Sequence, residues 1–208
     1  FTLFPYTTLF RSDMMAHVME RYFTNTVSVD MGDRLCESVL RTIIKAMPAA
    51  LANARDYDAR ADLMWASTIA HTDLLSCGRQ GDWASHNLEH ELSALYGVAH
   101  GAGLAVVFPA WMKFVVKHDP ARFAQFASRV FDVEIDMFDL IGTALEGIRR
   151  LEQFLTSIGM PVRLNELGVT DERYEEMATK TTRGGTCTIG NFVELDTADC
   201  VKIYQLMK

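Results

Sequence analysis

The sequence lacks several features that would assign it to a familiar class of protein. Its four cysteines, Cys36, Cys77, Cys187 and Cys200, form no C-x-x-C pair, so a zinc site built on paired cysteines is not expected. No apolar run approaches the roughly 20 residues that cross a bilayer. No Lys/Arg cluster stands out and the formal net charge is -7, which argues against a nucleic-acid partner. Scattered free thiols are typical of a reducing compartment, so we expect a cytoplasmic protein without a membrane segment.

The first twelve residues differ in character from the rest of the chain. They read F-T-L-F-P-Y-T-T-L-F-R-S, and they lack the basic start and small-residue cleavage site of a signal peptide. The stretch from Thr2 to Ser12 matches, residue for residue, the translation of a common short-read sequencing adapter. We therefore expect residues 1–12 to be a non-native artefact, a chain truncated before Asp13, and a single domain over residues 13–208. A genuine apolar, β-like leader is the alternative.

From Asp13 onward the apolar residues recur with the spacing of helices. No sustained alternation of apolar and polar residues calls for a sheet. The spacing predicts an all-α domain of eight or nine helices, with Pro48 and Pro109 as points of kinking or breakage. The expected helices cover residues 13–23, 33–54, 58–75, 83–96, 104–116, a stretch from 120, 136–158, 171–181 and 197–207.

Four side chains of the kinds that bind metal ions have suggestive spacings. Asp13 and His17 are one helical turn apart, and His100 follows His86 by fourteen residues. Gly97 can end the helix that carries His86, and a chain reversal there would bring His100 back beside it. One carboxylate and three imidazoles suit iron or zinc. D-x-x-x-H and H-x-x-x-H pairs also arise on ordinary helix faces, so the spacing alone leaves a purely structural role open.

Three further groups of residues are less informative. His71 is interpreted as a packing residue or as an outer neighbour of the metal ligands, and His118 as a loop histidine. The aromatic side chains of Trp65, Phe108 and Trp111 either shape a pocket for an alkyl chain or belong to the core.

Longer motifs resemble one known family. The segment H-E-L-S-A-L-Y-G-V-A-H-G-A-G-L-A-V-V-F-P-A-W-M-K, which begins at His90, is similar to the C-terminal half of iron-containing (group III) alcohol dehydrogenases, and most to those of the NAD(P)H-dependent butanol dehydrogenase type. D-M-M-A-H-V-M-E-R-Y-F, D-L-M-W-A-S-T-I-A and I-G-N-F-V-E-L follow the family pattern in the same order. The resemblance extends over residues 13–208.

The resemblance implies both a fold and a site. It implies the multi-helix C-terminal domain of the iron-containing alcohol dehydrogenase and dehydroquinate synthase-like fold. It places the Fe(II) or Zn(II) ligands at Asp13, His17, His86 and His100, and an active-site or proton-relay histidine at His90. NAD(P)H would bind a separate nucleotide-binding domain of the intact parent, since this chain carries no glycine-rich strand–turn–helix fingerprint. A homodimer is compatible with the resemblance.

The reaction that the resemblance implies is metal-assisted hydride transfer between a primary alcohol, such as butanol, or its aldehyde and the nicotinamide ring. The chain alone is expected to be inactive. Two alternatives stay open: a helical metal-dependent oxygenase or hydrolase with the same ligands, although the Glu-x-x-His pairs of di-iron bundles are missing, and a metal-binding or dimerising domain without activity of its own.

Overall fold

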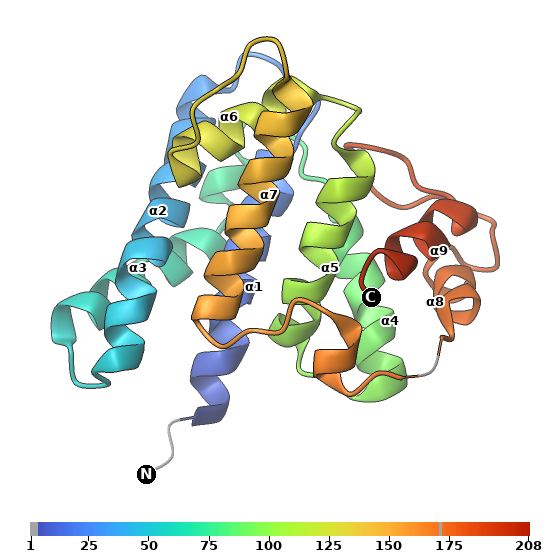
Figure 1. Ribbon diagram of the computed structural model, residues 1–208, viewed down its shortest axis with the longest axis horizontal. Coiled ribbons are helices and arrows are strands. Elements are labelled where there is room, and N and C mark those ends of the chain that lie inside the picture. Colours follow the sequence, from blue (N-terminus) through green and yellow to red (C-terminus); the bar gives the residue numbers. More distant parts are fainter. Residues whose placement is uncertain (1–3, 171) are drawn as a thin grey trace.

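The protein consists of helices joined by turns and loops (Figure 1). The computed structural model describes residues 4–170 and 172–208, with side chains from Ser12 onward. The α-helices are α1 (Phe4–Tyr22), α2 (Asp30–Ala52), α3 (Tyr57–His71), α4 (Ala84–Tyr96), α5 (His100–Val115), α6 (Pro120–Phe131), α7 (Leu140–Ser157), α8 (Tyr174–Thr181) and α9 (Thr197–Gln205), and the 3-10 helices are η1 (Asp73–Ser76) and η2 (Leu164–Leu167). The predicted all-α class is confirmed. Within the described ranges the β-type pairing is one isolated bridge between Ile189 and Leu195.

Helix α1 begins earlier than the sequence predicts. It runs from Phe4 to Tyr22, so Asp13 lies in its middle and not at its first turn. The hydroxyl of Ser12 donates a hydrogen bond to the carbonyl oxygen of Gly101 at 2.5 Å, which ties α1 to the start of α5. The proposed foreign origin of residues 1–12 stays a prediction, and residues 1–3 lie outside the described residues.

Helices α5 and α7 also differ from the sequence-based prediction. Helix α5 continues through Pro109, although a proline inside a helix costs about 3 kcal/mol. Every residue from Leu104 to Met112 is buried, and this burial offsets that cost. The helix expected over residues 136–158 begins only at Leu140, because the carboxylate of Asp139 accepts the Gly142 N–H at 2.8 Å and caps the helix.

Helix α5 lies at the centre of the fold, with α1, α4, α7 and α9 packed around it. The fully buried rings of Phe108 and Trp111 lie 5.3 Å apart, and Trp111 also lies 5.5 Å from Phe23. These rings belong to the core, whereas the side chain of Trp65 on α3 is 67% exposed. The three aromatic residues therefore do not line a common alkyl pocket.

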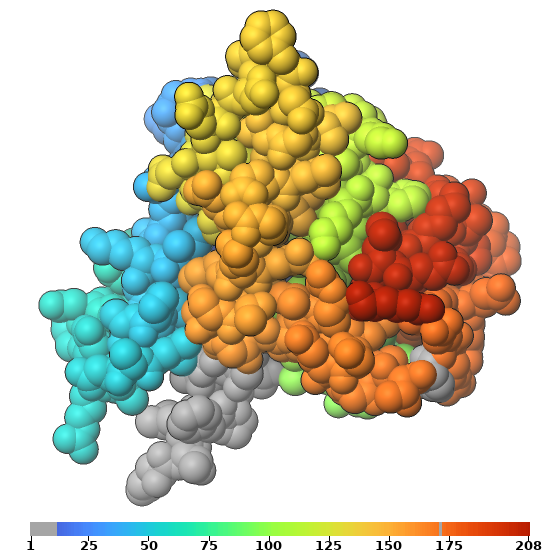
Figure 2. All heavy atoms as spheres, viewed as in Figure 1, coloured from blue at the N-terminus to red at the C-terminus, as the bar shows by residue number. Residues whose placement is uncertain are grey.

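The α6–α7 pair lies on one side of the core and ends in a projecting loop, seen in yellow-orange at the top of Figure 2. The two helices pack so closely at Gly147 that a Cβ atom there would lie only 2.4 Å from the Cβ of Ala127. None of the described helices is both long and apolar enough to cross a membrane. The cytoplasmic location stays a prediction.

Candidate metal centre

Three helices bring the predicted site residues together. Helix α1 carries Asp13 and His17 one turn apart, His86 lies in the first turn of α4, and His100 begins α5. Gly97 adopts the left-handed conformation, with φ 66°, and donates its N–H to the Ser93 carbonyl at 2.9 Å. This is the chain reversal expected from the sequence, and it places the rings of His86 and His100 5.5 Å apart.

The geometry centres on one oxygen atom, Oδ1 of Asp13. It lies 3.6 Å from Nε2 of His17, 3.9 Å from Nε2 of His86 and 3.6 Å from Nε2 of His100. Around a tetrahedral ion with bonds of about 2.1 Å, neighbouring ligand atoms are about 3.4 Å apart. The three distances from Asp13 are close to this value, so movement of the side chains toward one point would close all four around a single ion.

Unpaired polar atoms support the same interpretation. Oδ1 of Asp13 and Nε2 of His86 are buried, and neither has a hydrogen-bond partner among the described residues. Buried polar atoms are ordinarily paired, and each exception needs a reason. A cation between the two atoms would satisfy both, so these residues fit a divalent metal. Their role as ligands remains a prediction that this geometry supports.

Two buried glutamates stand behind the imidazoles. Glu20 lies 2.8 Å from Nδ1 of His86, and Glu89 contacts Nδ1 of His100. A carboxylate on Nδ1 fixes the imidazole so that its Nε2 lone pair points away from the carboxylate, which is the usual arrangement behind a metal-bound histidine. Neither glutamate was predicted from the sequence as part of the site. Their signal is the i, i+3 spacing from His17 and His86, which keeps them on the same helix faces.

Glu20 also organises the start of α4. Its carboxylate accepts the N–H of Trp83 at 2.6 Å and the N–H of His86 at 3.0 Å. Trp83 has the left-handed φ of 67° that directs these amides toward α1. Asp82 accepts the N–H of Ala84 at 3.1 Å. One glutamate on α1 thus positions both the helix and the histidine that it carries.

The electrostatic environment favours neutral imidazoles at two of the positions. Burial lowers the pKa of both His17 and His86 to about 4, so both rings are neutral at pH 7. The hydrogen bond with Glu89 raises the pKa of His100 above its usual 6.5. Burial raises the pKa of Glu20 to about 8. A nearby cation would oppose this last effect, because it favours the carboxylate.

His71 and His90 occupy the more open side of the centre. Nε2 of His71 is 3.2 Å from Oδ2 of Asp13. His71 therefore contacts a predicted metal ligand directly. His90 is exposed on α4, and its ring stacks on that of His100 with centroids 5.5 Å apart. The side chain of His86 is 8% exposed, against 32% for His71 and 34% for His100. The centre is therefore closed on one side and open on the other.

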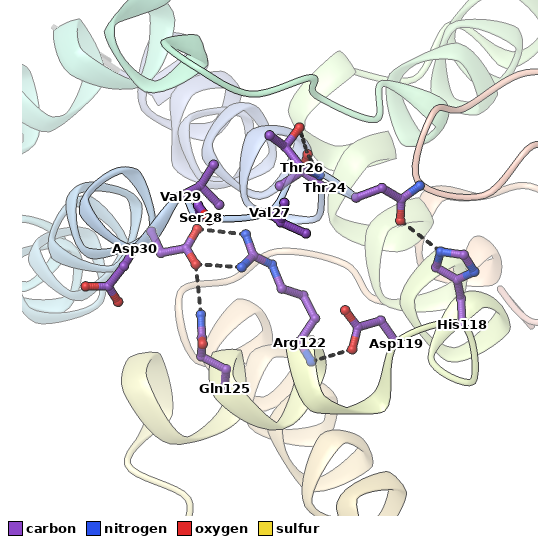
Figure 3. A pocket seen from close by; sticks show the side chains of 12 residues that line it. Thr24, Thr26, Val27, Ser28, Val29, Asp30, His118, Asp119, Arg122 and Gln125 are labelled. Atoms are coloured by element: carbon purple, nitrogen blue, oxygen red, sulfur yellow. Dashed lines mark hydrogen bonds and ion pairs between the residues drawn. The ribbon is translucent and has the colours of Figure 1, made fainter.

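A separate polar pocket of about 470 Å³ opens beyond the C-terminal end of α1 (Figure 3). Arg122 and Gln125 reach into it from α6, and both donate to the carboxylate of Asp33, at 2.5 and 3.0 Å for the shortest contacts. His118 lies in this pocket, where its Nε2 is 2.9 Å from the Asn25 side-chain oxygen. The side chains that meet here are already paired with one another.

Comparisons with known proteins identify the family. The model of the Fe-containing alcohol dehydrogenase family, C-terminal, matches residues 9–207. The chain is 42% identical to the probable NADH-dependent butanol dehydrogenase 1 of Bacillus subtilis, over 92% of this chain and 49% of that protein. It is 36% identical to NADH-dependent butanol dehydrogenase B of Clostridium acetobutylicum, over 93% of this chain and 50% of that protein.

Solved structures agree with these relatives. The substrate- and cofactor-free aldehyde reductase YqhD of E. coli matches with a TM-score of 0.91 at 29% identity, over 98% of this chain and 53% of that one. Butanol dehydrogenase A of Thermotoga maritima matches with a TM-score of 0.87 at 35% identity, over 96% of this chain and 51% of that one. The chain spans about half the length of these proteins. Since the family model covers nearly all of it, the chain belongs to the Fe-containing alcohol dehydrogenase family.

Proposed function

We propose that residues 13–208 are the helical metal-binding domain of an NAD(P)H-dependent alcohol dehydrogenase that interconverts primary alcohols of the butanol type and aldehydes. The observation that carries the proposal is the approach of three imidazole Nε2 atoms to Oδ1 of Asp13, at 3.6 to 3.9 Å. Relatives named NADH-dependent butanol dehydrogenase and NADPH-dependent aldehyde reductase support the cofactor and the substrate class.

Asp13, His17, His86 and His100 would hold Fe(II) or Zn(II). Three neutral imidazoles and one carboxylate leave a net charge of about +1 on a divalent ion, which when bound acts as a Lewis acid toward an alcohol or aldehyde oxygen. Glu20 and Glu89 orient two of the imidazoles from behind. Both glutamates are buried, and the low dielectric around them strengthens the hydrogen bonds that hold the two imidazoles in this orientation.

His90 is the proposed proton carrier. It lies at the open side of the centre, with its ring stacked on that of His100. Burial lowers the pKa of His90, which keeps the ring neutral at pH 7 and able to accept a proton from an alcohol hydroxyl group. Its exposure lets it pass that proton to solvent.

The nicotinamide is assigned to a separate domain of the intact parent. We expect the 208-residue chain to bind metal without oxidising NAD(P)H in the presence of butanal, since the relatives that carry the activity in their names are about twice as long. A cytoplasmic location and a homodimer remain predictions of the family resemblance.

Elemental analysis of the purified chain, reconstituted with Fe(II) or Zn(II), tests the metal centre. We expect about one ion per chain, lost in a His86→Ala, His100→Ala double variant. His118→Ala is the matched control, because this histidine lies in the pocket beyond α1. Far-ultraviolet circular dichroism confirms that each variant keeps its helices. A double variant that retains the metal, or a parent chain that binds none, contradicts the proposal.

A further inference from the structure

His71 makes the same pair of contacts as two of the proposed ligands. It is the last residue of α3, and its Nδ1 is 2.8 Å from the carbonyl oxygen of Ser67, one turn earlier. A carbonyl oxygen only accepts hydrogen bonds, so Nδ1 must carry the hydrogen. In the neutral ring the lone pair is then on Nε2, which faces Oδ2 of Asp13 at 3.2 Å. His86 and His100 likewise place Nδ1 against an acceptor and Nε2 toward Asp13.

His17 differs from these three histidines. Its Nδ1 lies 3.5 Å from Nη1 of Arg21, a group that can only donate. No acceptor within the described part of the chain holds a hydrogen on this Nδ1 in the way that Ser67 does for His71. By this comparison His71 is oriented as a ligand at least as well as His17 is.

The contact between His71 and Asp13 needs a positive partner. A carboxylate oxygen and a nitrogen lone pair 3.2 Å apart repel each other unless a proton or a cation lies between them. Oδ1 of Asp13 and Nε2 of His86 are buried and also lack a hydrogen-bond partner among the described residues. A single cation beside Asp13 would satisfy all of these atoms together.

The distances allow one ion to be shared. The ligand atoms of Asp13, His17 and His71 lie within 4.8 Å of one another, and so do those of Asp13, His86 and His100. Opposite donors around one ion with bonds of about 2.1 Å are about 4.2 Å apart. The two groups share Asp13, so movement of their imidazoles toward each other would let one ion contact more than four donors.

We propose that His71 is a further ligand of this metal centre, so that Asp13 and four imidazoles surround the ion. The inference rests on the proposed function, because it requires a metal at Asp13. Five protein donors exceed the four of a tetrahedral zinc site and suit an ion that accepts five or six ligands, such as Fe(II). His71 would thus favour iron over zinc.

Cobalt(II) is a suitable probe, because its visible absorption is strong when it has four ligands and weak when it has five or six. We expect the 208-residue chain loaded with Co(II) to absorb weakly, and the His71→Leu variant to absorb several-fold more strongly. The same variant should lose at least about tenfold of the preference for Fe(II) over Zn(II), a change of about 1.4 kcal/mol. His118→Leu is the matched control and should match the parent.

The outcomes separate the two proposals. A His71→Leu variant with the parent's spectrum overturns ligation by His71, whether or not its affinity falls, and leaves the centre of Asp13, His17, His86 and His100 standing. A parent chain that binds no Co(II) overturns both. His71→Gln provides a second variant, since its amide can donate to Asp13. If His71 only donates a hydrogen bond, Gln restores the parent's affinity and spectrum, and that result also overturns the inference.

Discussion

Two aspartates of this chain, Asp13 and Asp33, are both largely shielded from solvent, and their surroundings are opposite in kind. Asp33 is approached by Nη1 of Arg79 at 3.0 Å, Nη1 of Arg122 at 2.5 Å and the Gln125 amide at 3.0 Å. Each of these groups is a hydrogen-bond donor to the Asp33 carboxylate. Asp13 is approached instead by the Nε2 atoms of four histidines at 3.2 to 3.9 Å.

The difference arises from where the histidines keep their hydrogens. Glu20 and Glu89 draw the Nδ1 hydrogens of His86 and His100 away from Asp13. A carboxylate surrounded by donors is complete as an ion pair, whereas one that faces the Nε2 lone pairs of three of its four histidines, His71, His86 and His100, is complete only with a cation. The atoms that face an aspartate, more than its burial, therefore distinguish a structural ion pair from a metal ligand.

The largest expected effect comes from removing the donor-surrounded aspartate. Asp33→Ala would leave Arg122 and the fully buried side chain of Arg79 without their carboxylate, and should lower the free energy of unfolding by about 3–5 kcal/mol. Asp13→Ala, measured in the presence of a chelator, should change it by less than about 1 kcal/mol. Urea unfolding of both variants checks this, and equal losses would remove the distinction between the two aspartates.

A smaller effect is expected from the glutamate behind His86. Glu20→Gln should weaken metal binding about 10- to 100-fold, because the orientation of the imidazole is loosened. Chelator competition measures the affinity. Glu91→Gln on the same helix as His86 serves as the control and should bind metal as the parent does.

The same variant should alter the pH dependence of stability in the metal-free protein. Burial raises the pKa of Glu20 to about 8, above the usual value of about 4.3. The folded state therefore keeps a proton that the unfolded state has released, so the free energy of unfolding falls as the pH rises from about 4 to 8. Gln cannot ionise and should flatten this fall. An unchanged pH profile would mean that Glu20 is not buried in this way.

The smallest expected effect is the dependence of metal affinity on pH. In the Glu20→Gln variant, in which position 20 has no proton to release, His17 and His86, with pKa values lowered to about 4, release no proton on binding at pH 7, whereas His100, with its raised pKa, must release one. Below the pKa of His100 the affinity should fall about tenfold per pH unit, and more steeply only near pH 4. A fall of a hundredfold or a thousandfold in affinity per pH unit, already at pH 6, would show that the histidines titrate together.

Helical spacing alone was sufficient for part of this site. The i, i+4 pair on α1 and the reversal at Gly97 follow from local rules, and the structure places Asp13, His17, His86 and His100 around one point. The predicted start of α7 was wrong, because apolar periodicity does not distinguish a helix from the turn before it. In that turn Asp139 accepts the Gly142 N–H. Helix α5 continues through Pro109 because burial in the finished fold outweighs a local penalty.

The rest of the site depends on how helices dock. Glu20 meets His86 across 66 positions of sequence, and His71 meets Asp13 across 58. The i, i+3 spacing places Glu20 on the same helix face as His17, but neither contact follows from local spacing, since each depends on the packing of α1 against another helix. The left-handed Trp83 is equally hidden, because its N–H donates to the carboxylate of Glu20, which reaches it from another helix.

The uneven exposure of the centre has a stereochemical consequence. Glu20 and Glu89 have no exposed side-chain surface and close one wall with His86, whereas His71 and His100 are about one-third exposed. In the proposed function, a reactant would reach the centre from its open side. An aldehyde held between the closed wall and the hydride donor would present one of its two prochiral faces, so hydride transfer should yield a single enantiomer of a deuterium-labelled primary alcohol.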